Sequence, residues 1–116
     1  MDISFTVPGR PVPAARMTQR GKYVKTQAQR YLAYKEAVGW AARLAMRGKE
    51  MLKGDVSVEI WVFSTGKRIG DIDNIGKSIL DGMNKIVYLD DNQVIDFEIH
   101  SRKEMPERAE IVVKQV

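Results

Sequence analysis

The sequence of 116 residues contains no cysteine and only one histidine. Without thiols the chain can form neither disulfides nor thiolate metal sites, which fits a reducing compartment. No uninterrupted apolar run is long enough to span a bilayer, and residues 1–10 lack the layout of a secretion signal. We therefore expect a soluble, cytoplasmic protein with no membrane partner.

Acidic residues are missing from one long stretch of this basic chain, whose net charge is +4. Between Ile3 and Lys35 there is no aspartate or glutamate. The loop expected after the first strand carries five positive charges, which are Arg10, Arg16, Arg20, Lys22 and Lys25. Such a loop is suited to phosphates, although charge that serves only solubility is an equally good interpretation.

The hydrophobic pattern predicts a single α+β domain over residues 1–116. Apolar residues make up 44% of the chain and charged residues 29%, an ordinary composition for a folded protein. Alternation predicts strands near residues 3–9, 55–63, 93–103 and 108–116, and helical spacing predicts helices over about 26–46 and 74–85. The first helix should begin at Thr26, with Gln29 at capping-box spacing. The order β-α-β-α-β-β predicts helices packed on a mixed sheet, with the last two strands forming a hairpin.

Aromatic residues and the single histidine are assigned by their place in these patterns. Trp40 and Trp61 are expected in the core or an interface rather than as platforms for base stacking. His100 falls on the wet face of its strand, so we expect a surface residue rather than a general base.

Five aspartates crowd into residues 66–94, within the segments DIDNIGKSILDG and YLDDNQV. With Asp73 as N-cap, Lys77 and Asp81 follow at one-turn intervals on the polar face of the predicted helix. If strand 93–103 neighbours strand 55–63, Asp90 or Asp91 should arrive near the start of this helix. Carboxylates about 5 Å apart repel by roughly 3 kcal/mol, and a divalent cation removes that penalty. Oxygen ligands alone favour Mg²⁺ or Mn²⁺ over zinc.

Each part of this acidic set also has an interpretation without metal. Asp73 could simply cap a helix, and Lys77 could pair with Asp73 and Asp81 for a few tenths of a kcal/mol. Asp90 and Asp91 could belong to an ordinary turn. The combination is more specific than its parts, because a cap does not need Asp71 and a helical pair does not need Asp91.

The spaced pattern Asp-x-Asp-Asn-x-x-Lys, an aspartate four residues on, and then Leu-Asp-Asp-x-Gln-Val resembles the RusA family of Holliday-junction resolvases, common on prophages. The resemblance covers nearly the whole chain. It implies that Asp71, Asp73 and Asp91 are catalytic metal ligands for Mg²⁺, with Mn²⁺ as a substitute, and that Lys77 is needed for cleavage. It also implies a homodimer that binds four-way DNA and nicks two strands symmetrically, in recombination and repair.

In such an enzyme the basic residues would track the DNA phosphates that flank the cut. The candidates are Arg10, Arg16, Arg20, Lys22, Lys25, Lys67 and Arg68. Two alternatives stay open: a non-catalytic nucleic-acid-binding module with a structural divalent cation, and a homodimeric interaction protein whose aspartates are only caps and turns.

Overall fold

The computed structural model describes residues 2–15, 26–65 and 69–116 and has the predicted order of elements. One short 3-10 helix, η1, adds to the expected strands and helices. The bounds are β1 (Asp2–Pro8), α2 (Thr26–Ala45), β2 (Val56–Ser64), α3 (Ile72–Met83), η1 (Asp91–Gln93), β3 (Val94–Lys103) and β4 (Arg108–Gln115). The α+β class is confirmed, and α2 begins at Thr26, as expected.

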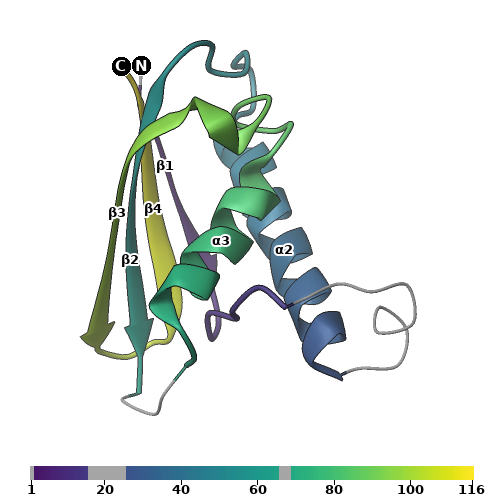
Figure 1. The fold of residues 1–116 in the computed structure, drawn as a ribbon, viewed down its shortest axis with the longest axis vertical. Coiled ribbons are helices and arrows are strands. Elements are labelled where there is room, and N and C mark those ends of the chain that lie inside the picture. The colour runs from purple at the N-terminus through teal and green to yellow at the C-terminus, as the bar shows by residue number, and fades with distance from the viewer. Residues whose placement is uncertain (1, 16–25, 66–68) are drawn as a thin grey trace.

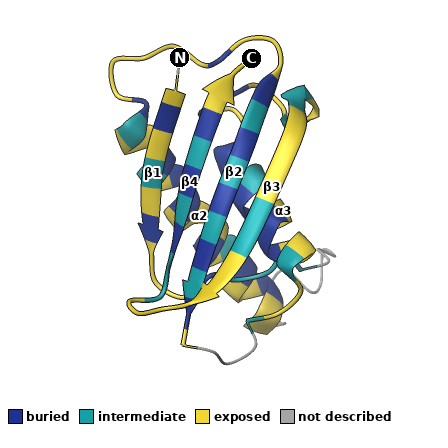
Figure 2. Ribbon diagram, turned by 90° about the vertical axis from the view of Figure 1, so that its left-hand side faces the viewer, coloured by how far each residue is buried: buried dark blue, intermediate teal, exposed yellow. Residues whose placement is uncertain are grey.

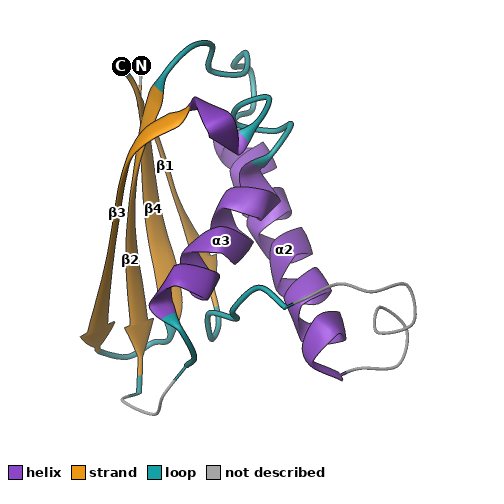
Figure 3. Ribbon diagram, in the orientation of Figure 1, coloured by secondary structure: helices purple, strands orange, loops and turns teal. Residues whose placement is uncertain are grey.

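Both helices cover one face of a four-stranded sheet whose order is β1-β4-β2-β3 (Figures 1 and 3). β4 pairs antiparallel with β1 and β2, whereas β3 pairs parallel with β2, so the sheet is mixed. The parallel pair exists because the chain returns through α3 before it enters β3. In the described part of the chain, no helix is both long and apolar enough to cross a membrane.

The predicted hairpin between the last two strands is wrong. β2 lies between β3 and β4, so these two strands are not neighbours. β4 is an interior strand, between β1 and β2. Its buried residues Ala109, Ile111 and Val113 alternate with half-buried ones and face the helices. β3 is left at the edge because the crossover through α3 delivers it to the free side of β2.

The core lies between the helices and the covered face of the sheet. Val58 and Ile60 of β2 meet Ile75 and Ile79 of α3 in one buried cluster, which Val38 of α2 completes. Burying a side chain of this size contributes about 1.5–3 kcal/mol. The core therefore fixes α3 along its length, together with the polar residues on its opposite face.

Within the described residues, no helix lies on the other face of the sheet (Figure 2). There Trp61 is half-buried and stacks on His100, with ring centroids 4.2 Å apart. His100 thus lies on the predicted face, although it is half-buried. Trp40 is 58% exposed on α2, so neither tryptophan belongs to the core.

Candidate metal and DNA-binding site

The first acidic residues lie at the N-terminal end of α3. Asp71, rather than Asp73, is the N-cap: its carboxylate oxygen Oδ1 accepts from the backbone N–H of Asp73 over 3.3 Å. The helix begins one residue after Asp71, earlier than the pattern of apolar residues predicted. Both carboxylates are exposed, and both sit where the helix dipole favours negative charge.

The segment that follows β1 holds this end of α3 in place. The N–H of Ala14 donates to the carbonyl of Asn74 over 2.8 Å. The hydroxyl of Ser78 donates to the carbonyl of Val12 over 2.7 Å. Pro13 lies close enough to Gly70 that a Cβ there would sit 3.0 Å from the proline ring. The start of the predicted phosphate-contacting loop is therefore fixed beside Asp71.

A groove with two arginines runs along the same end of the molecule. Arg10 and Arg30 line it together with Pro11 and Ile69. Arg10 also donates to Glu107 over 2.8 Å in an exposed ion pair, which is worth at most about 1 kcal/mol. Positive side chains thus adjoin the exposed carboxylates at the start of α3.

A second group of carboxylates lies at the other end of α3. Asp81 accepts a hydrogen bond of 2.6 Å from the hydroxyl of Tyr31 on α2. Partial burial and the neighbouring Asp90 and Asp81 carboxylates raise the pKa of Asp91, while Lys77 acts in the opposite direction. These charges repel one another, and the charged form of Asp91 is disfavoured.

Gln93 fixes the turn that carries Asp90 and Asp91. Its side-chain amide donates to the carbonyls of Leu52, at 3.1 Å, and Gly54, at 2.8 Å. Its oxygen accepts from the backbone N–H of Asp90 and of Leu89. Asp90 and Gln93 form a capping box, so their spacing in the sequence is the signal that identifies this role. For Tyr31, which we did not predict, the sequence offers no comparable signal.

Lys77 occupies the polar face of α3 between the two acidic groups. It is exposed, and its ammonium is electrostatically close to Asp91. In the described ranges, it forms no ion pair within 4.0 Å with Asp73 or Asp81. The ammonium is therefore available to an anion outside the chain.

The expected meeting of Asp91 with the helix start is not found within one chain. Val94 pairs with Val56 at the beginning of β2, whereas α3 starts after the end of β2. A parallel neighbour thus brings η1 to the opposite end of α3 from Asp71 and Asp73 (Figure 1). Among the described residues, no three acidic, histidine or cysteine side chains gather closely enough to hold a metal ion. The assignment of Asp71, Asp73 and Asp91 as metal ligands stays a prediction.

Most of the predicted DNA-contacting residues lie outside the described ranges. Arg10 is described, and it stands beside the start of α3. The others are Arg16, Arg20, Lys22, Lys25, Lys67 and Arg68.

Comparison with known proteins places the chain in one family. The family described as endodeoxyribonuclease RusA matches residues 8–114. The crossover junction endodeoxyribonuclease RusA of Aquifex aeolicus is 28% identical over 111 residues, which cover 91% of this chain and 83% of that protein. YqaN of Bacillus subtilis is 25% identical over 138 aligned residues, covering 98% of this chain and 96% of YqaN. The match to residues 8–114 spans both acidic groups and Lys77, and this chain belongs to the RusA endodeoxyribonuclease family.

Proposed function

We propose that this protein is a divalent-metal-dependent endonuclease that resolves four-way DNA junctions by paired nicks, in DNA recombination and repair. The family match across residues 8–114 carries the proposal, and the similarity to a crossover junction endodeoxyribonuclease names the substrate. The arrangement of carboxylates and Lys77 along α3 supplies groups suited to that chemistry.

The donor set fits Mg²⁺, with Mn²⁺ as a substitute. Asp71, Asp73 and Asp91 offer only hard carboxylate oxygens, which these ions prefer. Partial burial, together with the neighbouring Asp90 and Asp81 carboxylates, raises the pKa of Asp91, and a cation relieves the repulsion among these charges. When bound, the ion supplies Lewis-acid chemistry at a phosphate. Lys77 contacts the scissile phosphate and stabilises the charge that grows on its oxygens.

The remaining polar residues of α3 play supporting roles. Asp81, fixed by its 2.6 Å bond to Tyr31, sets the local field around Lys77. Asn84, the C-cap of α3, follows about one turn after Asp81 and two turns after Lys77. Arg10 and the basic residues of the following loop hold the flanking phosphates. That contribution is largely independent of base sequence and weakens steeply with salt.

A homodimer completes the site, because the ligands of one chain stand at opposite ends of α3. A two-fold axis that turns one α3 against the other brings Asp91 of each chain towards Asp71 and Asp73 of its partner. The same axis generates two sites, which matches the two symmetric nicks that resolve a junction.

The test incubates purified protein with labelled four-way, three-way and linear DNA, in Mg²⁺ and in EDTA. We expect paired nicks in the four-way junction, only with Mg²⁺, and little cutting of linear DNA. Binding of the junction without any nicking would instead favour the non-catalytic DNA-binding module.

Complementation tests the shared site. Asp73→Asn and Asp91→Asn should each abolish nicking and leave junction binding intact. Co-refolded as heterodimers, the two variants restore one complete site, so single-strand nicks should return. Absence of recovery in verified heterodimers would show that each chain holds its own ligands.

A further inference from the structure

Tyr31 ties α2 to the polar face of α3. It is buried, with 5% of its surface exposed, and its hydroxyl donates to the Asp81 oxygen Oδ2 over 2.6 Å. A hydroxyl that donates to a carboxylate at this distance forms a short, charge-assisted hydrogen bond. Because the two residues come from different helices, the bond fixes one carboxylate of α3 from outside its own helix.

Glycine brings the two helices close enough for this bond. Gly82 follows Asp81 directly, and a Cβ there would meet the side chain of Val38 on α2 at 2.7 Å. The distance between packed helices depends on the side chains at their contact, so a larger residue would move α3 away from α2. The close contact beside Asp81 thus keeps its carboxylate within reach of the Tyr31 hydroxyl.

Folding of α3 does not favour a charge at Asp81. The residue lies two positions before the helix ends at Met83, where the negative end of the helix dipole opposes a carboxylate. In the described ranges it forms no ion pair within 4.0 Å with Lys77. Tyr31 supplies the one hydrogen bond that its side chain accepts in this part of the chain.

Asp81 lies among the carboxylates of the second acidic group. Partial burial and the charges of Asp90 and Asp81 raise the pKa of Asp91. Burial and the charges of the same three carboxylates raise the pKa of Tyr88, which lies beneath them. The Tyr88 hydroxyl donates to a backbone carbonyl of α3 over 3.0 Å, so Tyr31 and not Tyr88 holds Asp81.

A carboxylate held in this way is suited to the water shell of a hard cation. With Oδ2 bound to Tyr31, the oxygen Oδ1 of Asp81 can accept hydrogen bonds from outside the chain. Mg²⁺ keeps several of its waters when protein carboxylates bind it. Groups just beyond the direct ligands orient the ligands and the bound waters, and their removal typically costs about 10–100-fold in metal affinity or activity.

We propose that Tyr31 is a positioning residue of the nuclease site. Its hydroxyl holds Asp81 so that Oδ1 accepts hydrogen bonds from the waters of the cation that Asp91 binds. Tyr31 itself contacts neither the cation nor the DNA. This inference rests on the proposed function, because that function assigns Asp91 to the cation.

Tyr34, one turn further along α2, provides the matched control. It is 6% exposed, and its hydroxyl has no hydrogen-bond partner among the described residues. Burial raises the pKa of both tyrosines, and the hydrogen bond to Asp81 and its charge raise that of Tyr31 further. Both hydroxyls therefore stay protonated near neutral pH, and they differ in what they contact.

Removal of each hydroxyl separates positioning from packing. Tyr31→Phe keeps the ring but releases Asp81, so Mn²⁺ affinity should fall about tenfold, measured by electron paramagnetic resonance on the protein without DNA. Single-turnover cleavage of four-way DNA at limiting Mg²⁺ should fall to a similar extent, with junction binding unchanged. Tyr34→Phe should match the parent chain in all three measurements. Parent-like Mn²⁺ affinity in Tyr31→Phe, or an equal loss in Tyr34→Phe, would overturn the proposal.

A second variant changes the free oxygen and keeps the bond to Tyr31. In Asp81→Asn the amide oxygen can still accept from the hydroxyl, but an N–H donor replaces Oδ1, so Mn²⁺ affinity should again fall about tenfold. Adding Tyr31→Phe to this variant should cause no further loss, because Tyr31 acts through Asp81. Additive losses would show that Tyr31 acts through packing alone and would overturn the proposal.

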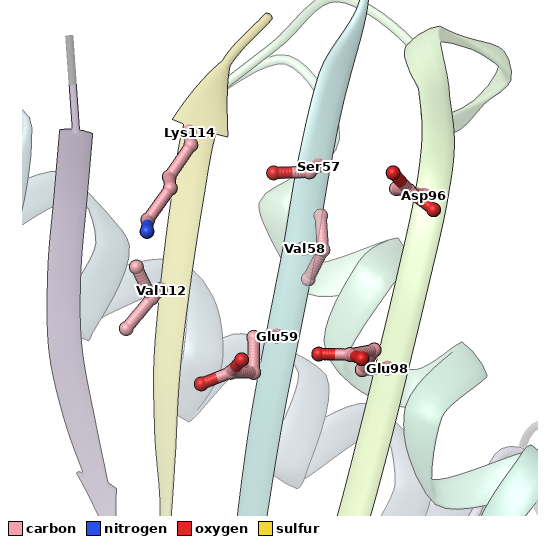
Figure 4. Close-up of a pocket in the computed structure, with 7 residues that line it drawn as sticks. All are labelled: Ser57, Val58, Glu59, Asp96, Glu98, Val112 and Lys114. Atoms are coloured by element: carbon pink, nitrogen blue, oxygen red, sulfur yellow. The ribbon is translucent and has the colours of Figure 1, made fainter.

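Glu59 is the matched control for Asp81→Asn. It also accepts from an aromatic residue, since the indole N–H of Trp61 donates to it over 3.0 Å. Figure 4 shows it beside Glu98 on the open face of the sheet, away from the helices. Glu59→Gln should leave Mn²⁺ affinity unchanged. A loss equal to that of Asp81→Asn would show that net charge alone sets the affinity, against the proposal.

Failure of this inference is distinguishable from failure of the proposed function. A chain that never nicks junctions, but loses Mn²⁺ affinity in Tyr31→Phe and not in Tyr34→Phe, would support the role of Tyr31 and overturn the nuclease. A chain that nicks junctions in Mg²⁺, with Tyr31→Phe as active and as strongly bound to Mn²⁺ as the parent, would do the opposite.

Discussion

The two ends of α3 carry carboxylates under opposite physical conditions. Asp71 and Asp73 stand at the helix start, where one caps the helix and both meet the positive end of its dipole. Folding alone accounts for these charges. An aspartate here contributes about 0.5–2 kcal/mol as a cap, whether or not the protein binds metal.

At the C-terminal end of α3, the carboxylates do not stabilise the fold in this way. Partial burial and the neighbouring Asp90 and Asp81 carboxylates raise the pKa of Asp91, and the helix dipole there is negative. The Gln93 side chain nevertheless makes four hydrogen bonds that fix this turn. The comparison teaches that the second group is the better indicator of function, because its charges oppose folding.

The largest expected effect is on the residue between the two ends. Lys77→Gln keeps the length and helix propensity of the side chain but removes the ammonium. If Lys77 stabilises charge on the scissile phosphate, cleavage of four-way DNA should fall by about 100-fold or more, measured under single-turnover conditions. Junction binding should change little, because many other contacts hold the DNA.

Lys35→Gln on the exposed surface of α2 is the matched control for Lys77→Gln, and it should cleave normally. Full cleavage by Lys77→Gln would show that Lys77 takes no part in the reaction.

A second contrast concerns the glycines that let α3 approach its neighbours. A Cβ at Gly82 would meet Val38 at 2.7 Å and the backbone oxygen of Lys35 at 3.0 Å, in the tight crossing of α2 and α3. A Cβ at Gly76 would clash with the end of the Phe97 ring at 2.7 Å and lie at ordinary contact distance, 3.5 Å, from Ile99 Cδ1. The Phe97 ring lies at an exposed edge.

Gly82→Ala should therefore destabilise the protein by about 1–3 kcal/mol, measured by urea unfolding. Gly76→Ala should cost far less, because the ring can turn aside and alanine favours the helix by about 1 kcal/mol. Equal losses in the two variants would show that the ends of α3 are packed with the same tightness.

The sequence was sufficient to predict most of the fold, because β2, α2 and α3 each combine a clear period with their own stop signals. It was not sufficient to predict the position of β4. A strand that follows another after a short turn favours a hairpin, and only the crossover through α3, with β4 filling the interior of the sheet, shows otherwise. Strand order depends on packing that no local pattern records.

For the candidate site, the sequence supplied the residue types but not their separation. The polar face of α3 with Lys77 was predictable from helical spacing, and the Gln93 turn from its capping box. The position of Asp91 depends on the direction of β3 relative to β2. The crossover through α3 makes β3 parallel to β2, and this places Asp91 at the opposite end of the helix from Asp71. The expectation that they meet overlooked this consequence of the predicted strand-helix-strand order.

The smallest expected effect tests whether the charge at Asp91 opposes folding. Its pKa in the folded protein lies above the ordinary value of 3.8, through partial burial and the Asp90 and Asp81 carboxylates. The folded state therefore binds more protons than the unfolded state between these two pKa values, and stability falls as the pH rises through that window.

In EDTA at about pH 7, Asp91→Asn should unfold at a higher temperature than the parent chain. Near pH 3, where the carboxyl is protonated in both states, the gain should disappear. Asp55→Asn, which removes an exposed carboxylate from the loop before β2, is the control. Saturating Mg²⁺ should then stabilise the parent chain and not the variant, because only the parent keeps the full ligand set. A variant that is less stable than the parent in EDTA at about pH 7 would mean that Asp91 serves the fold, as Asp71 does at the other end of the helix.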